Sequence, residues 1–265
     1  MFRAGSAPQQ QQRQAQAQQL KQAALQHQRQ QTAQMGTVSK LMGGLRSSQD
    51  ELVDYLIDSR LVKSSRVADA LRAVDRGKYV NHAYASRTDA YQDHPLAIGE
   101  GQTISAPHMH AICLELLQAH LQPGARVLDV GSGSGYLSAA MAKMVAPNGS
   151  VLGVDKVPEL VVRARAALQS ANPELLAGEE GHELLRILHG NALSDMLAAE
   201  APFDAIHVGA AADELHQALL DKLALGGRMV VPVGPHYSYQ VPTQQALLRG
   251  CVGTCITASM NDECL

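Results

Sequence analysis

The spacing of apolar and polar positions changes near residue 125, and this change divides the chain. Downstream of it, short apolar runs of strand length alternate with longer stretches of helical period. The predicted strands cover residues 125–130, 151–154, 184–188, 205–208 and 228–232. The predicted helices cover residues 135–145 and 158–168, a short stretch after 192, and 212–223. Buried runs that alternate with helices predict an α/β fold, in which a doubly wound, mostly parallel sheet is covered on both faces.

The region before residue 125 has helical periods and one long irregular stretch. Ser48 followed by Glu51 forms the pattern of a capping box, which predicts a helix to about residue 59. A second helix is predicted from Ser64 or Ser65 to about residue 74, and a third over residues 107–120. Residues 76–105 have no clean period, so we predict a long loop there, and such loops are often functional. The polar and irregular residues 170–183 are predicted to form an insertion loop.

The two ends of the chain differ from the middle in composition. Residues 1–46 form a glutamine-rich extension with little apolar surface to bury, which predicts disorder. Two alternatives stay open for it, an organelle transit peptide and a glutamine-rich helix for self-association. Residues 47–240 then form the folded domain, and residues 241–265 a tail of different character that holds three of the four cysteines.

Overall composition and charge narrow the class of protein. The chain has 265 residues, of which 46% are hydrophobic, enough for a core without disulfide staples. No apolar run reaches the roughly 18 residues that span a bilayer, and no secretory signal is present, so we expect a cytoplasmic protein that does not act at membranes. The organelle alternative rests on the N-terminal extension. The net charge of −3 is unevenly distributed. Residues 1–49 hold six basic residues and no acid, whereas the rest of the chain holds 16 basic and 25 acidic residues, a net of −9. Such a negative charge repels phosphate, so we expect that the folded part does not bind nucleic acid.

The strongest local signal is the segment VLDVGSGSGY at residues 127–136. An apolar strand ends in Asp129, and Gly131, Gly133 and Gly135 follow directly. Glycine allows a tight turn and a close approach of ligand to backbone, and the next helix points its free N–H groups toward that ligand. The second strand ends in Asp155, where a carboxylate can accept hydrogen bonds from both hydroxyls of a ribose.

The spacing of the glycines bears on which ligand binds. A nicotinamide dinucleotide site has the pattern G-x-G-x-x-G, whereas this turn is G-x-G-x-G and has Tyr136 at the third dinucleotide position. Asp129 would repel a pyrophosphate but could pair with a cationic amino acid. This combination suits S-adenosylmethionine, which carries an ammonium and a sulfonium and no phosphate. A nicotinamide enzyme and a glycine turn without a ligand remain alternatives at this point.

Several longer stretches resemble one enzyme family. TISAPHMHA at 103–111 and DAIHVGAAA at 204–212 are similar to stretches specific to the protein-L-isoaspartate (D-aspartate) O-methyltransferases. LDVGSGSG at 128–135 is shared with many methyltransferases. The smaller matches RVADALRAVDRGKYV and LGGRMVVPVG agree in order and spacing, so the resemblance runs from about residue 52 to 234. It implies the class I S-adenosylmethionine-dependent methyltransferase fold with N-terminal helices.

The resemblance also implies roles for individual residues. The family's active-site serine falls on Ser105. Its cofactor contacts fall on the following residues: Gln102, Thr103, Ile104, Ser105, His110, Asp129, Gly131, Gly133, Gly135 and Asp155. The family has an Asp-Gly pair near the adenine, where this chain has Asn191 and Ala192. Asparagine can still accept a hydrogen bond and also offers a donor, so an adenine contact at this pair stays an expectation.

The implied reaction is methyl transfer from S-adenosylmethionine to the free α-carboxylate of L-isoaspartyl and D-aspartyl residues in damaged proteins, which initiates their repair. An α-carboxylate with a pKa near 3.5 is ionised at pH 7, so the acceptor needs no general base. Ser105 is then expected to position the carboxylate rather than to act as a nucleophile. The expected partners are proteins and peptides that contain isoaspartyl residues, and the enzyme is expected to act as a monomer.

Simpler interpretations of these residues remain open. Ser105 could cap the helix that begins near Pro107. His108 and His110 form an H-x-H pair, but no further ligand is spaced to complete a metal site. His207 at the end of an apolar strand could be a hydrogen-bonded core histidine or a site residue. As a whole, the protein could also methylate a small molecule or nucleic acid, or be a weakly catalytic binding protein that keeps the fold.

The C-terminal tail motivates the binding-protein alternative. The family resemblance stops after about residue 239, where the family continues with two more strands. If nothing replaces them, the strand at 228–232 becomes an exposed edge, and we would then expect weak binding and aggregation. Residues 250–260 could supply at most one replacement strand, through Val252, Thr254, Ile256 and Thr257.

Overall fold

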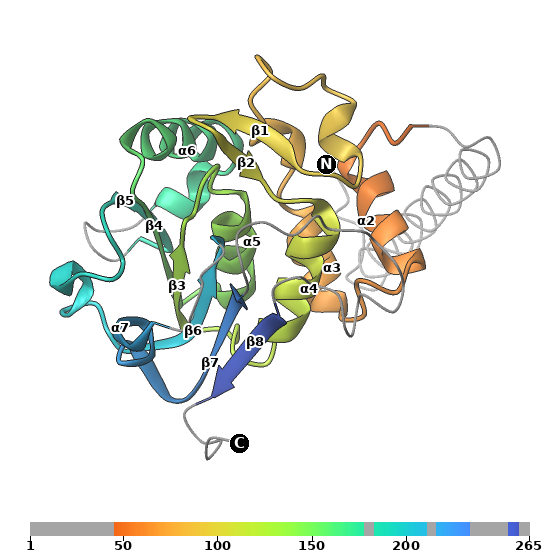
Figure 1. Ribbon diagram of the computed structural model, residues 1–265. Coiled ribbons are helices and arrows are strands. Elements are labelled where there is room, and N and C mark those ends of the chain that lie inside the picture. The colour runs from red at the N-terminus through yellow and green to blue at the C-terminus, as the bar shows by residue number, and fades with distance from the viewer. Residues whose placement is uncertain (1–44, 178–182, 211–215, 234–253, 260–265) are drawn as a thin grey trace, which may run out of the picture. The chain divides into compact units, whose positions relative to one another are not determined.

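The computed structural model describes residues 45–177, 183–210 and 216–233, and the backbone of one further strand at 254–259. The predictions for residues 1–44, and for most of the tail after residue 233, lie outside this part of the chain. The central element is a six-stranded sheet in the order β5-β4-β3-β6-β7-β8 (Figure 1). Its strands are β3 (Arg126–Val130), β4 (Ser150–Asp155), β5 (Leu185–His189), β6 (Phe203–Val208), β7 (Leu223–Val233) and β8 (Thr254–Ser259). Five strands are parallel and β8 alone is antiparallel, so the predicted mostly parallel sheet is confirmed.

Two apolar cores cover the two faces of the sheet, as a doubly wound fold requires. On one face Val127, Val151 and Ala205 pack with helices α5 (Tyr136–Val145) and α6 (Pro158–Ala171) and with the N-terminal helices. On the other face, Leu128 and Ile206 pack under helix α7 (Gln217–Leu220) and the short 3-10 helix η4 (Asp195–Leu197). Neighbouring residues of one strand therefore serve opposite cores, which explains why successive central positions of the strands are apolar.

The helices before the sheet agree with their sequence signals. They are α2 (Gln49–Asp58), α3 (Ser65–Arg72) and α4 (Pro107–Leu117). The Ser48 side chain accepts a hydrogen bond from the backbone N–H of Glu51, as the capping box predicts, while the Glu51 carboxylate bonds the backbone N–H of Ser47 instead of that of Ser48. Ser64 occupies the cap position of α3 without a side-chain cap bond.

The prediction of one long loop over residues 76–105 was wrong. This stretch contains two short 3-10 helices, η1 (Arg76–Lys78) and η2 (Asp89–Tyr91), and an antiparallel hairpin of β1 (Leu96–Gly99) and β2 (Gln102–Ile104). Strands of three and four residues are too short to show a period, which is why the sequence pattern missed them. The predicted insertion loop likewise begins inside α6 and contains the 3-10 helix η3 (Pro173–Leu176).

The described part of the tail completes the sheet. Strand β8 pairs antiparallel with β7, from Arg228 opposite Ser259 to Val233 opposite Thr254 (Figure 1). The anticipated exposed edge at 228–232 is therefore covered, and the tail supplies the one replacement strand that its sequence allows. Within the described residues, no helix is long and apolar enough to cross a membrane.

Candidate active site

The site begins with two residues that stand side by side at the carboxyl ends of neighbouring strands. Asp129 of β3 and His207 of β6 are direct partners in the parallel register, although 78 positions separate them in the chain. The His207 Nδ1 lies 2.8 Å from the Asp129 Oδ1, and the Ser138 hydroxyl of α5 donates to the other carboxylate oxygen at 2.5 Å. Both Asp129 and His207 are buried, so the carboxylate has exchanged water for these two donors.

The glycine turn that follows β3 has the backbone that only glycine adopts without strain. Gly131, Gly133 and Gly135 all have positive φ angles, of 74°, 53° and 80°. The Asp155 carboxylate holds this turn from the next strand, because it accepts the N–H of Gly133 at 2.9 Å and that of Val157 at 2.9 Å. Each carboxylate oxygen keeps a second lone pair, so acceptor capacity for a pair of ribose hydroxyls remains.

The end of β6 also comes very close to the glycine turn. A Cβ on Gly209, which follows β6, would lie 2.8 Å from the Gly131 carbonyl oxygen. The two strand ends can therefore meet only because residue 209 is glycine. Its N–H donates to the Val130 carbonyl at 2.7 Å, which continues the pairing of β3 with β6 beyond the strands.

A cavity of about 40 Å³ opens between these strand ends, the glycine turn and the start of α4. It is lined by Thr103, Ile104, Ser105, His110, Asp129, Gly131, Ser132, Gly133, Ser134, Leu137, His207 and Gly209. At roughly 10–15 Å³ for each water-sized group, the volume suits a small polar head group rather than a nucleoside. In the part of the chain that the structure describes, the lining contains one carboxylate, two histidines and several hydroxyls, and neither lysine nor arginine. This chemistry favours a cationic head group over a phosphate.

Ser105 lies half-buried on the cavity wall, between β2 and α4. The N-cap of α4 is Ala106, and no side chain makes a cap hydrogen bond there. The interpretation of Ser105 as a helix cap is therefore wrong. Among the described residues its hydroxyl has no hydrogen-bond partner, so it is available to a ligand in the cavity.

His110 of α4 reaches the cavity with a different partner behind it. Its Nδ1 lies 3.4 Å from an Nη of Arg76, whose side chain is fully buried. Burial, and then the positive charge of Arg76, hold the pKa of His110 well below its ordinary value. Burial also lowers the pKa of Arg76 to about 10, so the guanidinium stays charged at neutral pH. His108 turns elsewhere, with its Nδ1 2.8 Å from Asp93, so the two histidines of the H-x-H pair serve different partners.

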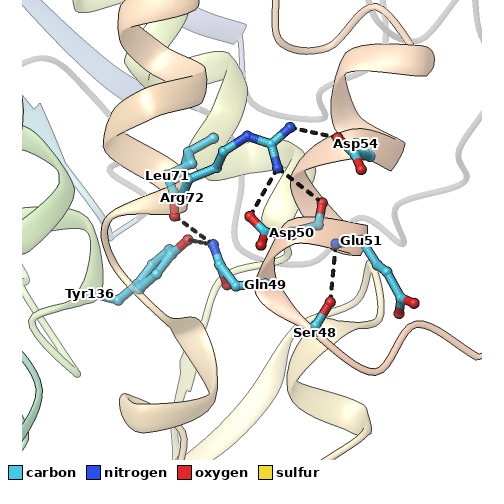
Figure 2. A network of polar contacts seen from close by, with 8 residues as sticks. All are labelled: Ser48, Gln49, Asp50, Glu51, Asp54, Leu71, Arg72 and Tyr136. Atoms are coloured by element: carbon cyan, nitrogen blue, oxygen red, sulfur yellow. Dashed lines mark hydrogen bonds and ion pairs between the residues drawn. The ribbon is translucent and has the colours of Figure 1, made fainter. Parts of the chain in front are cut away.

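The buried Gln49 connects the N-terminal helices to the start of α5. Gln49 of α2 donates to the Leu71 carbonyl at 2.7 Å and to the hydroxyl of Tyr136 at 3.3 Å (Figure 2). Its amide oxygen accepts the backbone N–H of Arg76 at 3.0 Å. Tyr136 is the first residue of α5 after the glycine turn, so this network links the N-terminal helices to the turn.

The structure brings most of the predicted site residues together. Seven of them line the cavity, namely Thr103, Ile104, Ser105, His110, Asp129, Gly131 and Gly133, and Asp155 bonds to the turn itself. Like Asp155, the remaining four lie outside the cavity lining: Gln102 is exposed in β2, Gly135 is the N-cap of α5, Asn191 is exposed and Ala192 is buried. The Asn191 side-chain oxygen accepts the N–H of Leu193 at 3.0 Å, so it shapes its own turn.

Sequence reasoning did not commit to several lining residues. Ser132, Ser134 and Leu137 belong to the glycine turn and the first turn of α5, and proximity to the glycines could have indicated them. His207 and Gly209 were harder to place, because only the order of the strands brings β6 beside β3. Two signals were available: a polar residue at the end of an apolar strand, and the stretch at 204–212, which resembles the family and contains both residues.

Comparisons with known proteins agree on one family. The model of the family described as protein-L-isoaspartate(D-aspartate) O-methyltransferase matches residues 47–249. Protein-L-isoaspartate O-methyltransferase 1 of Arabidopsis thaliana is 48% identical over 185 residues, which are 69% of this chain and 76% of the relative. The protein-L-isoaspartate O-methyltransferase of Caenorhabditis elegans is 44% identical over 187 residues, 71% of this chain and 78% of the relative.

One solved structure matches the fold as well as the sequence. It is the crystal structure of a protein-L-isoaspartate O-methyltransferase from Plasmodium falciparum in complex with S-adenosyl-L-homocysteine. The TM-score is 0.65 at 36% identity, and the match covers 73% of this chain and 87% of the other.

Proposed function

Because this chain belongs to the protein-L-isoaspartate (D-aspartate) O-methyltransferase family, we propose that its cavity positions an isoaspartyl carboxylate for methylation. The chain has the fold of class I S-adenosylmethionine-dependent methyltransferases and uses S-adenosylmethionine. It methylates the free α-carboxylate of L-isoaspartyl residues in damaged proteins, which initiates their repair. D-aspartyl residues are included in the proposal through the description of the family.

The residues of the cavity fit this cofactor. Among the described residues the lining holds no lysine or arginine for a phosphate, and it offers the buried pair of Asp129 and His207 to a cation. The cavity has the scale of an amino-acid head group. Asp155 keeps free lone pairs at the next strand end, where a ribose would follow. When bound, S-adenosylmethionine supplies a methyl group on a sulfonium, which is the electrophile of the reaction.

The chain has little chemistry to perform on the acceptor. An α-carboxylate with a pKa near 3.5 is already ionised at neutral pH, so no side chain has to remove a proton. The protein must strip water from the carboxylate and aim one oxygen at the methyl group. Ser105 is suited to this task because its hydroxyl lines the cavity and has no partner among the described residues. We assign it the role of donating a hydrogen bond that orients the carboxylate.

One observation supports the proposal most. The two stretches that are specific to the family are 103–111 and 204–212. They lie 93 positions apart, from residue 111 to residue 204, yet both reach the same small cavity beside the glycine turn. Thr103, Ser105 and His110 come from the first stretch, and His207 and Gly209 from the second. A cofactor turn alone would suit many acceptors, whereas these two stretches are specific to the family and meet at one cavity.

The proposal is tested against its rivals with three classes of acceptor. The purified full chain is incubated with methyl-labelled S-adenosylmethionine and, separately, an isoaspartyl peptide, a mixture of small carboxylic acids and transfer RNA. We expect label only in the peptide. Label in the small acids or the RNA would support a different methyltransferase, and no label with intact cofactor binding would support a binding protein.

We further propose that the enzyme acts as a cytoplasmic monomer, without nucleic acid or membrane as a partner. The net charge of −9 after residue 49 supports the exclusion of nucleic acid, because it repels phosphate. Sedimentation of the full chain tests the oligomeric state, and imaging of a C-terminally labelled protein tests the compartment against the organelle alternative.

A further inference from the structure

The hydrogen bond between Asp129 and His207 has a fixed donor and a fixed acceptor. An ionised carboxylate only accepts hydrogen bonds, so the His207 Nδ1, 2.8 Å from it, must carry the proton. In this tautomer the lone pair of the ring is on Nε2. The Ser138 hydroxyl donates to the second oxygen of Asp129 and completes a buried chain of hydrogen bonds behind His207.

On the His110 ring the donor and acceptor nitrogens are exchanged relative to His207. Arginine only donates, so the His110 Nδ1 that faces Arg76 at 3.4 Å must be the acceptor, and Nε2 carries the proton. The two histidines that line one cavity therefore present different groups, His110 an N–H donor and His207 an acceptor. A cation that enters this cavity can donate to His207 but finds no acceptor on the His110 ring.

Asp129 lines the cavity but presents very little surface to it. Its exposed fraction is 2%, and one hydrogen bond already reaches each of its oxygens. The sequence had suggested a direct pairing of this carboxylate with the cationic end of the cofactor. His207 lines the same cavity, is more exposed than Asp129 and is hydrogen-bonded to it, so the negative charge also acts on a ligand through the imidazole ring.

We propose that His207 is a cofactor-binding residue, whose Nε2 accepts a hydrogen bond from the α-ammonium of S-adenosylmethionine while Asp129 supplies the balancing charge. This inference rests on the proposed function of the cavity. His207 thereby selects cofactors that carry a free amino group and fixes the amino-acid end beside Ser105. The Ser138–Asp129–His207 chain is a positioning device rather than a general base, because the carboxylate acceptor has no proton to remove.

The experiment uses titration calorimetry on the wild-type protein, one variant and one control variant. The main ligands are S-adenosylhomocysteine and its deaminated analogue, in which hydrogen replaces the ammonium group. A third ligand is the decarboxylated analogue, in which hydrogen replaces the carboxylate. The variant is His207→Asn, because an asparagine amide can still donate to Asp129 at the position of Nδ1 but has nothing at the position of Nε2. Wild-type protein should prefer the amine by about 10–100-fold, the range for one hydrogen bond to a charged group.

The inference predicts that His207→Asn loses this preference, with weaker binding of S-adenosylhomocysteine and unchanged binding of the deaminated analogue. The matched control is His120→Asn, because His120 bonds only the Gly226 carbonyl at the far end of α4 and should change neither affinity. Thermal melts verify that both variants fold.

Three results would overturn the inference. The variant could keep the full preference for the amine, or it could lose affinity for both ligands equally, which would indicate a role in shape alone. It could also lose discrimination against a decarboxylated analogue instead, which would mean that His207 contacts the carboxylate. The proposed function fails separately, if wild-type protein does not bind S-adenosylhomocysteine at all.

Discussion

Two buried carboxylates end neighbouring strands of the sheet, and they are used in different ways. Asp129 at the end of β3 is bonded by two side chains, those of His207 and Ser138. Asp155 at the end of β4 is bonded by two backbone N–H groups, those of Gly133 and Val157. The first carboxylate sets which nitrogen of a histidine carries a proton, and the second sets the shape of the glycine turn.

The difference separates two kinds of control over one ligand. At the Asp129 end the polarity of side chains decides which head group fits, and the backbone is already fixed by the strands. At the Asp155 end a side chain holds the backbone, so a substitution there changes the turn as well as the ligand contact. Perturbing the two ends should therefore give different combinations of lost affinity, lost turnover and lost stability.

The largest effect is expected from Asp155→Ala. The variant removes the acceptor for two ribose hydroxyls, which should weaken S-adenosylhomocysteine binding by about 2–4 kcal/mol. It also leaves the N–H groups of Gly133 and Val157 without their partner, so stability should fall by about 1–3 kcal/mol. Calorimetry and urea unfolding measure the two losses. The exposed Asp195 offers a control, because Asp195→Ala should leave affinity unchanged; an Asp155 variant with unchanged affinity would exclude the ribose role.

On the Asp129 side, Ser105→Ala should lower kcat by about 10–100-fold, with a smaller change in the apparent constant for the cofactor. A hydrogen bond that orients the carboxylate mainly in the transition state is worth about 1.5–3 kcal/mol and appears in kcat. Ser48 is the matched control, because it is a true N-cap. Ser48→Ala should lower stability by about 1 kcal/mol and leave kcat unchanged. A Ser105 variant with wild-type kcat would remove this serine from the mechanism.

The buried His110 gives a pH dependence that the Asp155 end should lack. Its pKa in the folded protein is below the ordinary value of 6.5, so the unfolded chain takes up the proton first as the pH falls. Stability is then lost as the pH drops below 6.5, by up to about 1.4 kcal/mol per pH unit for one proton. The amide oxygen of His110→Asn can still accept a hydrogen bond from Arg76, but the side chain does not titrate. The contribution of residue 110 to the change of unfolding free energy with pH should therefore vanish in this variant.

Urea unfolding between pH 7.5 and 5.5 measures that slope for the wild-type protein and the variant. Replacement of the exposed His94 by asparagine is the control for a histidine outside the core. Identical slopes in wild type and His110→Asn would show that His110 is not held neutral by its surroundings.

The smallest effect is expected from removal of residues 1–45. This stretch lacks apolar periodicity and precedes both the first capping box and the region that matches the family. The truncated protein should melt at the same temperature and methylate peptides at the same rate, so the comparison of the two carboxylates should be unaffected. A markedly lower melting temperature would assign the extension a structural role.

The sequence predicted the repeating parts of this fold well. Strands β3 to β6 and helices α5 and α6 begin and end within a few residues of their apolar periods. The glycine turn and the two carboxylates at strand ends were also visible, because their chemistry follows directly from neighbouring residues. The hairpin of β1 and β2 was not, since its strands are too short for a period.

What the sequence could not provide is the order of the strands. Asp129 and His207 meet only because β6 lies beside β3, and residues that are far apart in the chain carry no local signal of this contact. The hydrogen-bond partners of Asp129 were therefore hidden, and a direct contact with the ligand was the simplest expectation. The same limit applied to Arg76, whose position behind His110 depends on the packing of α4 against the segment after α3.

The most direct test of the account measures methyl transfer by the full chain to two peptides that differ in a single linkage. One peptide contains an L-isoaspartyl residue, and its twin contains ordinary aspartate at the same position. The account predicts label in the isoaspartyl peptide as a methyl ester and none above background in the twin, because only the isoaspartyl linkage exposes an α-carboxylate. Equal labelling of both peptides would contradict it.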